Sequence, residues 1–254
     1  MQNTDSHSSP MHSNPGTPCR SEIKVLVFDV FGSVVDWRTS IERDLSRWGR
    51  TQGIDADWQA FALAWRGLYQ PNLDQIRSGK RAWTLLDDLH REALESLLPQ
   101  FGLTHLSEAQ KAHINQVWHR LDPWPDSIAG LSRLKSHFTI APLSNGNVAL
   151  LTNMAKYAGL PWDLILSSEW FRAYKPQPET YLGVVRVMGL EPHQVMMCAA
   201  HNSDLAAARK LGLRTAFWAR PTEYGSMQSR DFEANQDWDF IATDIRDLAR
   251  QLID

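Results

Sequence analysis

The strongest constraint on the fold is a short apolar run that ends in an aspartate and a glycine turn. Residues 23–28 are apolar except for Lys24, and they are followed by Asp29 and then by Gly32. A run rich in β-branched residues predicts a buried strand, and the glycine supplies the turn that lets the chain leave it. Ligands of open α/β sheets bind at the carboxyl edge of the strands. Asp29 is therefore predicted to lie where a ligand can bind.

The chain beyond this strand carries helical spacing over a long distance. Four stretches show it, namely 38–51, 56–69, 79–98 and 107–121. The third stretch places its leucines along one stripe, and the fourth opens with the capping-box pair Ser107 and Gln110. These patterns predict an all-helical insert over residues 38–121.

Strand and helix patterns alternate after Pro123 and Pro125. The predicted helices cover 127–136, 148–158, 179–188 and the residues from Leu205 to Leu211, and the predicted strands cover 138–143, 162–166, 194–199 and, last, 215–218. Such alternation indicates a parallel sheet covered by helices on both faces. The expected fold is therefore α/β, with a Rossmann-like doubly wound core domain (22–37 and 122–254) interrupted by a helical cap domain (38–121).

Composition excludes several classes of function. A chain of 254 residues with 43% hydrophobic content can bury one large core and a smaller second one, and a net charge of −3 gives no general attraction to nucleic acid or anionic membrane. No stretch has the apolar length of a membrane span. Residues 1–21 are rich in Ser, Asn, Pro and His, so we expect a disordered extension without a signal peptide. Cys19 and Cys198 make no disulfide framework, which suits a cytoplasmic protein.

Polar residues follow several of the predicted strands. They are Asp29, the pair Ser144 and Asn145, Lys175, and the segment from His201 to Asp204. Each one alone is an ordinary turn, cap or surface residue, but four segments that reach one sheet edge indicate a site.

These groups suffice for covalent hydrolysis. An ionised Asp29 can act as a nucleophile, and Lys175 is its natural counter-ion. Asp204 can hold that lysine and orient a water, while the side chains of Ser33, Ser144 and Asn145 supply hydrogen-bond donors.

The same segments resemble a known family. Phe28 to Ser33, Ser144 with Asn145, Lys175 with Pro176, and Asp204 together resemble the haloacid dehalogenase superfamily, most closely the L-2-haloacid dehalogenases, from about residue 22 to the end. The resemblance implies a helical cap over the sheet edge, an active site between the two domains, a homodimer, and no metal or other cofactor.

The resemblance also implies a reaction and a set of roles. Asp29 would displace halide from the α-carbon of a short 2-haloalkanoic acid, and water would hydrolyse the resulting ester to a 2-hydroxy acid of inverted configuration. Ser33 stands where the family usually has threonine. The remaining implied roles are halide binding by Arg66 with Asn145, carboxylate binding by the Val30 and Phe31 backbone and the Ser144 hydroxyl, charge balance by Lys175, and a substrate-site tyrosine at Tyr181.

Two departures from the superfamily separate its activities. Magnesium-dependent phosphatases carry an aspartate where this chain has Phe31, and a second acidic residue near the last motif, where this chain has Ala199 to His201. Phe31 can neither protonate a leaving group nor tolerate a wet, charged site, and Mg²⁺ prefers oxygen ligands. The sequence therefore favours a dehalogenase over a phosphatase or phosphonatase. The joint presence of Asp29, Lys175 and Asp204 speaks against a non-catalytic relative that binds a carboxylate or a protein partner.

Some assignments stay open at this level. His201 can orient the water or Asp204, or it can be a structural histidine bonded to backbone. Arg66 on an amphipathic helix can equally be a solvated residue or half of an ion pair. Cys198 fits strand core better than a metal pair with His201, and residues 220–225 receive only a place along the cleft. The accepted halogens, fluoride above all, depend on a pocket volume that the sequence does not give.

Overall fold

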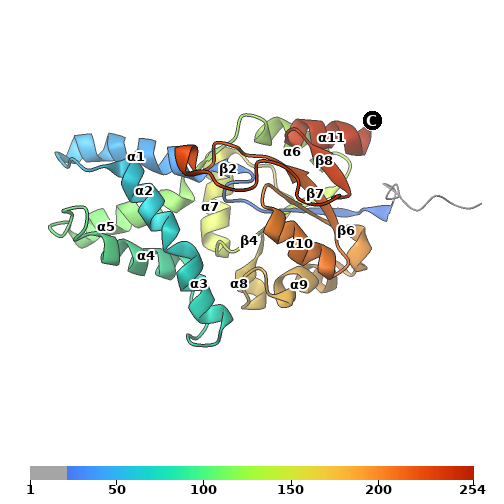
Figure 1. Cartoon of the computed structure of the whole chain (residues 1–254), viewed down its shortest axis with the longest axis horizontal. Coiled ribbons are helices and arrows are strands. Elements are labelled where there is room, and N and C mark those ends of the chain that lie inside the picture. Colours follow the sequence, from blue (N-terminus) through green and yellow to red (C-terminus); the bar gives the residue numbers. More distant parts are fainter. Residues whose placement is uncertain (1–21) are drawn as a thin grey trace, which may run out of the picture.

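The computed structural model describes residues 22–254, and a parallel sheet of six strands forms its centre (Figure 1). The order is β5-β4-β1-β6-β7-β8, and each neighbouring pair is parallel. The strands are β1 (Val25–Phe28), β4 (Thr139–Ser144), β5 (Leu166–Ser167), β6 (Val195–Ala199), β7 (Arg214–Trp218) and β8 (Phe240–Ala242). The chain leaves β1 toward β4 and leaves β6 toward β7, so the connections diverge between these two neighbouring strands. A ligand crevice is expected at their carboxyl ends.

Helices cover both faces of this sheet (Figure 1). Leu26 and Phe28 of β1 belong to one hydrophobic core, which also holds apolar residues of α6, α7 and α11. Val25 and Val27 belong to a second core with residues of α9 and α10. The helices of this part are α6 (Ser127–Lys135), α7 (Val148–Ala158), α8 (Ser168–Phe171), α9 (Pro178–Met188), η3 (Pro192–Gln194), α10 (Asn202–Lys210), η4 (Gly225–Met227) and α11 (Ile245–Ile253). The predicted doubly wound fold is confirmed.

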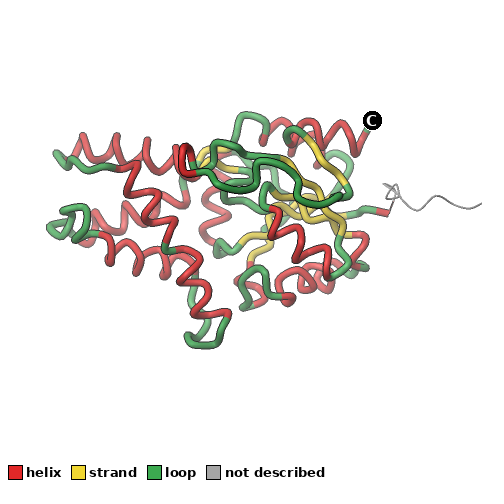
Figure 2. The backbone as a smooth tube through the Cα atoms, in the orientation of Figure 1, coloured by secondary structure: helices red, strands yellow, loops and turns green. Residues whose placement is uncertain are grey.

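A second group of helices lies beside the sheet (Figures 1 and 2). It comprises α1 (Trp37–Gln52), α2 (Trp58–Gly67), α3 (Tyr69–Arg77), α4 (Leu86–Leu97), α5 (Glu108–Asn115) and η2 (Gln116–His119). The chain enters and leaves this group through two short antiparallel strands, β2 (Val35–Asp36) and β3 (Asp122–Pro123). The predicted helical insert is confirmed, and so is the capping box of Ser107 and Gln110. Its separation as a domain at residues 38 and 121 stays a prediction.

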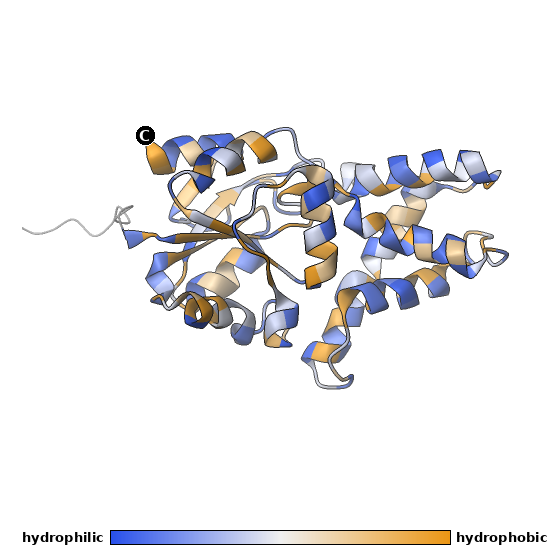
Figure 3. Ribbon diagram, turned by 180° about the vertical axis from the view of Figure 1, so that it is seen from behind, coloured by the Kyte–Doolittle hydropathy of each residue, from blue (hydrophilic) through white to orange (hydrophobic). Residues whose placement is uncertain are grey.

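Most helices are amphipathic, with hydrophilic and hydrophobic residues on each (Figure 3). In α4 the leucine stripe is buried together with His90, whereas Asp88 is exposed and Arg91 is partly exposed. Among residues 22–254, no helix has both the length and the apolar character needed to cross a membrane.

Several predicted boundaries inside the insert are wrong. The helix predicted over 79–98 begins only at Leu86, because residues 79–85 form a turn and loop that start at Gly79, which has a φ of +72°. The helix predicted over 56–69 ends at Gly67, and α3, which was not predicted, follows after Leu68.

Two boundaries outside the insert also differ from the prediction, and two elements at the end of the chain were not predicted. The strand predicted over 162–166 is reduced to β5, and α10 begins at Asn202, so Asp204 lies in its first turn instead of preceding it. The strand at 215–218 is not the last one, because β8 and α11 follow it. The predicted extension 1–21, with Cys19, lies outside the described residues.

Candidate active site

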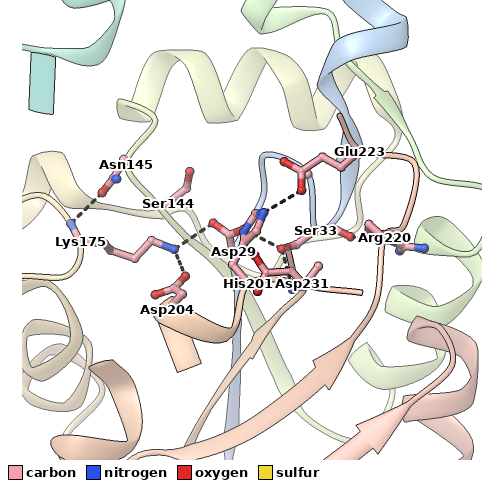
Figure 4. A network of polar contacts seen from close by, with 12 residues as sticks. Asp29, Ser33, Ser144, Asn145, Lys175, His201, Asp204, Arg220, Glu223 and Asp231 are labelled. Atoms are coloured by element: carbon pink, nitrogen blue, oxygen red, sulfur yellow. Dashed lines mark hydrogen bonds and ion pairs between the residues drawn. The ribbon is translucent and has the colours of Figure 1, made fainter. Parts of the chain in front are cut away.

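Asp29 lies at the carboxyl end of β1, and its two carboxylate oxygens have different partners (Figure 4). Oδ1 accepts a hydrogen bond from Lys175 Nζ at 2.9 Å. Oδ2 accepts one from Ser33 Oγ at 2.6 Å and contacts His201 Nδ1 at 2.9 Å. Burial opposes ionisation of Asp29, but Lys175 and His201 outweigh it and hold the pKa of this carboxyl well below its usual range. Asp29 is therefore ionised and firmly oriented.

Lys175 joins Asp29 to a second carboxylate. Its Nζ also donates to Asp204 Oδ2, and Tyr181 donates its hydroxyl proton to Asp204 Oδ1 at 2.5 Å. Burial favours the neutral amine, but the two carboxylates outweigh it and raise the pKa of Lys175 above its ordinary value. Tyr181 was predicted in the substrate site, and here its hydroxyl orients Asp204.

His201 lies between two carboxylates. Its Nδ1 faces Asp29, and its Nε2 lies 2.8 Å from Oε2 of Glu223 (Figure 4). An ionised carboxylate only accepts hydrogen bonds, so both contacts together require a ring that carries two protons. Burial disfavours that charge, but Glu223 and Asp29 outweigh it and raise the pKa of His201 well above its ordinary value. Among the described residues the ring bonds neither Asp204 nor backbone, so these two predicted partners are wrong, whereas a role in orienting the water stays a prediction.

Glu223 is a buried residue of this site that the sequence did not reveal. It is 1% exposed, and its Oε1 accepts a hydrogen bond from Trp37 Nε1 at 2.9 Å. Burial raises the pKa of this carboxyl, but the neighbouring His201 outweighs it, and the pKa lies below its ordinary value. The only signal was its place in a segment assigned to the sheet edge.

The glycine turn after β1 makes room for Glu223. Gly32 has a φ of +86°, and a Cβ at this position would lie 2.1 Å from Glu223 Oε1. Gly32 is therefore needed both for its backbone conformation and for the approach of this carboxylate.

Replacing Gly32 by alanine is expected to lower the free energy of unfolding by about 2–4 kcal/mol, because it adds a clash to the strain of a positive φ. Urea unfolding measures the change. Gly53→Ala is the matched control, since Gly53 has a φ of +67° with nothing within 4 Å of the added Cβ. It should cost only about 1–2 kcal/mol. Equal losses in the two variants would show that Glu223 does not fill the space beside Gly32.

Arg220 supports the same turn from behind. Its Nε donates to the Ser33 carbonyl oxygen at 3.1 Å, and its two terminal nitrogens bond Asp126 at 2.7 and 2.8 Å. Of the segment 220–225, which was expected along the cleft, only Tyr224 lines the cavity. Arg220 instead fixes the backbone that carries Ser33.

Arg66 reaches the site from the end of α2. Its guanidinium carbon lies 4.1 Å from the ring centroid of Tyr69, 5.4 Å from that of Trp37 and 5.9 Å from that of Phe31. Within residues 22–254 its buried Nη1 has no hydrogen-bond partner. Burial opposes the charge, but the neighbouring tyrosines and Glu223 outweigh it and raise the pKa of Arg66 above its ordinary value. A buried cation with a free hydrogen-bond donor suits an anionic ligand.

Asn145 connects the cap helices with the sheet edge. Its Nδ2 donates to the Tyr69 hydroxyl at 3.0 Å, and its Oδ1 accepts from the backbone N–H of Lys175 at 2.8 Å and from Ser168 Oγ at 2.9 Å. The amide nitrogen of Asn145 therefore lies beside the Tyr69 hydroxyl, and the Arg66 guanidinium packs over the Tyr69 ring.

These side chains border a cavity of about 410 Å³, whose lining includes Asp29, Phe31, Arg66, Lys175, His201 and Asp204. Asn145 and Tyr181 also line it, whereas Ser33, Val30 and Ser144 do not. Ser144 is fully buried, and its Oγ accepts from the Gly146 N–H at 3.1 Å. Phe31 is 2% exposed and packs edge-on against Trp118. Cys198 is buried in β6 as predicted. Among residues 22–254, no group of three or more His, Cys, Asp or Glu is placed to hold a metal.

Comparison with known proteins agrees with this geometry. A model of the haloacid dehalogenase-like hydrolases matches residues 23–212, so the chain belongs to that family. Its relatives include an (S)-2-haloacid dehalogenase of Xanthobacter autotrophicus, 30% identical over 78% of this chain and 76% of the relative. Two crystal structures resemble the present structure, each with a TM-score of 0.88 over 91% of this chain. One is a defluorinating L-2-haloacid dehalogenase (46% identical, 95% of that chain covered), and the other is an L-2-haloacid dehalogenase (50% identical, 98% covered).

Proposed function

We propose that this protein is a hydrolytic 2-haloacid dehalogenase that converts short 2-haloalkanoic acids to 2-hydroxy acids and halide. Haloacetates and L-2-halopropionates are the expected substrates. The observation that carries this proposal is that one cavity is lined both by an ionised, immobilised Asp29 and by the buried guanidinium of Arg66, whose Nη1 has no hydrogen-bond partner among residues 22–254. The similarity to named dehalogenases supports it.

In the first step, Oδ1 of Asp29 attacks the α-carbon and the carbon–halogen bond breaks. Lys175 and His201 balance the charge of the carboxylate while leaving its lone pairs able to react. The departing halide takes the bonding electrons, and Arg66 with the Asn145 amide stabilises it. The product of this step is an ester between Asp29 and the substrate.

The substrate carboxylate needs donors of its own. We assign these to the backbone N–H groups of Val30 and Phe31, which follow Asp29 directly. The Ser144 hydroxyl, which the family resemblance also implies, is fully buried and does not line the cavity, so its part stays a prediction. Asp204 orients the water that hydrolyses the ester, since Lys175 and Tyr181 hold both of its oxygens in place.

The position of Phe31 supports carbon–halogen chemistry over phosphoryl transfer. Two residues beyond the nucleophile the cavity wall is a phenyl ring packed on Trp118, so no carboxylate is available there to protonate a leaving alkoxide. We further propose a cytoplasmic enzyme that works as a homodimer without a metal, in line with the two cysteines and the family resemblance.

A halide-release panel tests the function. Chloro-, bromo- and fluoroacetate and both enantiomers of 2-chloropropionate are incubated with the enzyme, with and without EDTA, alongside phosphate monoesters. We expect halide release from haloacetates and the L enantiomer that EDTA does not change. Turnover of phosphate esters that EDTA abolishes would indicate a phosphatase, and binding of 2-haloacids without any turnover would indicate a non-catalytic relative.

A further inference from the structure

We propose that His201 donates a hydrogen bond to the carbonyl oxygen of the Asp29 ester while water hydrolyses it, and that Glu223 is the positioning residue that keeps His201 an imidazolium. This inference rests on the proposed function and adds a division of labour between the two oxygens of Asp29.

The contacts of Asp29 separate its oxygens by task. Among residues 22–254, Oδ1 faces only Lys175, which is also bonded to Asp204 and lines the cavity. Oδ2 faces Ser33 and His201, and Ser33 Oγ in turn accepts from the Ala200 N–H at 2.9 Å. Two donors on one oxygen form the arrangement that stabilises a developing oxyanion. Oδ1 is therefore the attacking oxygen, and Oδ2 becomes the carbonyl oxygen of the ester.

The charges of the site explain why a histidine needs a buried glutamate here. Three carboxylates (Asp29, Asp204 and Glu223) face three cations (Lys175, Arg66 and His201). Once Asp29 is esterified it loses its charge, and it no longer helps to keep His201 protonated. Glu223, 2.8 Å from Nε2 and almost fully buried, then remains to hold the proton on the ring.

Hydrolysis begins with the attack of water on the Asp29 ester. The water oxygen forms a bond to Cγ of Asp29, one water proton passes to Asp204, and the carbonyl π electrons move to Oδ2, where Ser33 and His201 stabilise the negative charge. The tetrahedral intermediate collapses, and the Cγ–Oδ1 bond breaks. Oδ1 takes the proton held by Asp204 and leaves as the hydroxyl oxygen of the product, and the second water proton is released to solvent, so Asp204 is again a carboxylate. Asp29 is regenerated as a carboxylate.

Glu223→Gln separates the two steps. The amide keeps the size of the side chain and can still accept from Nε2, but it removes the charge that holds the proton. In single-turnover experiments with bromoacetate, we expect bromide release within about tenfold of wild type. Ester hydrolysis at pH 8 should be slower by about ten- to a hundredfold, so that intact-protein mass spectrometry detects the accumulated ester. Glu233→Gln, an exposed change on the same C-terminal segment, is the matched control.

The pH profile distinguishes charge from structure. Because Glu223 stays beside Nε2 after Asp29 is esterified, we expect the wild-type imidazolium to persist over pH 6–8, and hydrolysis should be flat in that range. In Glu223→Gln the pKa falls toward the ordinary value of about 6.5, so hydrolysis should approach wild type near pH 6 and decline as the pH rises. Equal slowing of both steps, or a loss that does not vary with pH, would overturn the proposal.

A measurement on the wild-type protein avoids any question of misfolding. The ¹⁵N shifts of the His201 ring at pH 8, assigned by comparison with His201→Asn, should show both nitrogens protonated. A neutral ring would refute the inference. This result does not depend on substrate, whereas an enzyme that releases no halide from any 2-haloacid would contradict the proposed function instead.

Discussion

Asp29→Asn is expected to lower halide release from 2-haloacids by on the order of 10⁴-fold or more, because the amide nitrogen and oxygen are poor nucleophiles and the charge that drives displacement is lost. Ion chromatography of the released halide measures this. Asp237→Asn is the matched control, since the Asp237 side chain is fully exposed and forms an ion pair with Arg209 at the surface. Its activity should stay within about twofold of wild type.

Isotope labelling tells covalent catalysis from direct attack by water. In a single turnover in H₂¹⁸O, the label should enter Asp29 and be absent from the first hydroxy acid. Label in that first product would contradict the nucleophile assignment, even if Asp29→Asn were inactive.

Lys175→Met should lower the free energy of unfolding by about 3–5 kcal/mol, because it leaves two carboxylates, Asp29 and Asp204, buried without their shared cation. Urea unfolding at pH 7 measures the loss. The variant should also lose halide release, since Asp29 is then oriented on one oxygen only.

A second substitution checks this explanation. Asp204→Asn added to Lys175→Met removes one of the two stranded charges, so the double variant should regain part of the lost stability, by about 1–3 kcal/mol. Lys156→Met, at an exposed position on α7, controls for the loss of a lysine as such. No recovery in the double variant would mean that Lys175 stabilises the fold mainly through its packing.

The alternation of strands and helices could be predicted because it depends on local periodicity. The run before Asp29 and the segment before Ser144 are apolar, neighbouring parallel strands of the sheet, and the polar residue stands at the carboxyl end of each. The helix break at Leu68 and the loop at 79–85 could not be predicted, because helical spacing continues through both. The strand β8 has three residues and an exposed Ile241, which is too little pattern for a prediction.

The site was predictable as far as its residues follow strands directly. Asp29, Asn145 and Asp204 lie within a few positions of a strand end, so the sheet brings them together. Glu223 reaches His201 through a loop whose path depends on the Arg220 and Asp126 pair and on the space at Gly32. None of these contacts leaves a mark on local periodicity, so the two carboxylate partners of His201 could not be predicted.

The fixed orientation of Asp29 means that the water oxygen incorporated in one turnover stays in the attacking position for the next. Ser33 and His201 hold Oδ2 while Lys175 holds the other position, so the carboxylate is not free to rotate between cycles. Each hydrolysis replaces the attacking oxygen with one from water, and this water-derived oxygen takes the Oδ1 position that faces the next substrate. Every hydroxy acid after the first would then carry the oxygen that was incorporated into Asp29 one cycle earlier. The Oδ2 atom bonded to Ser33 would never be exchanged.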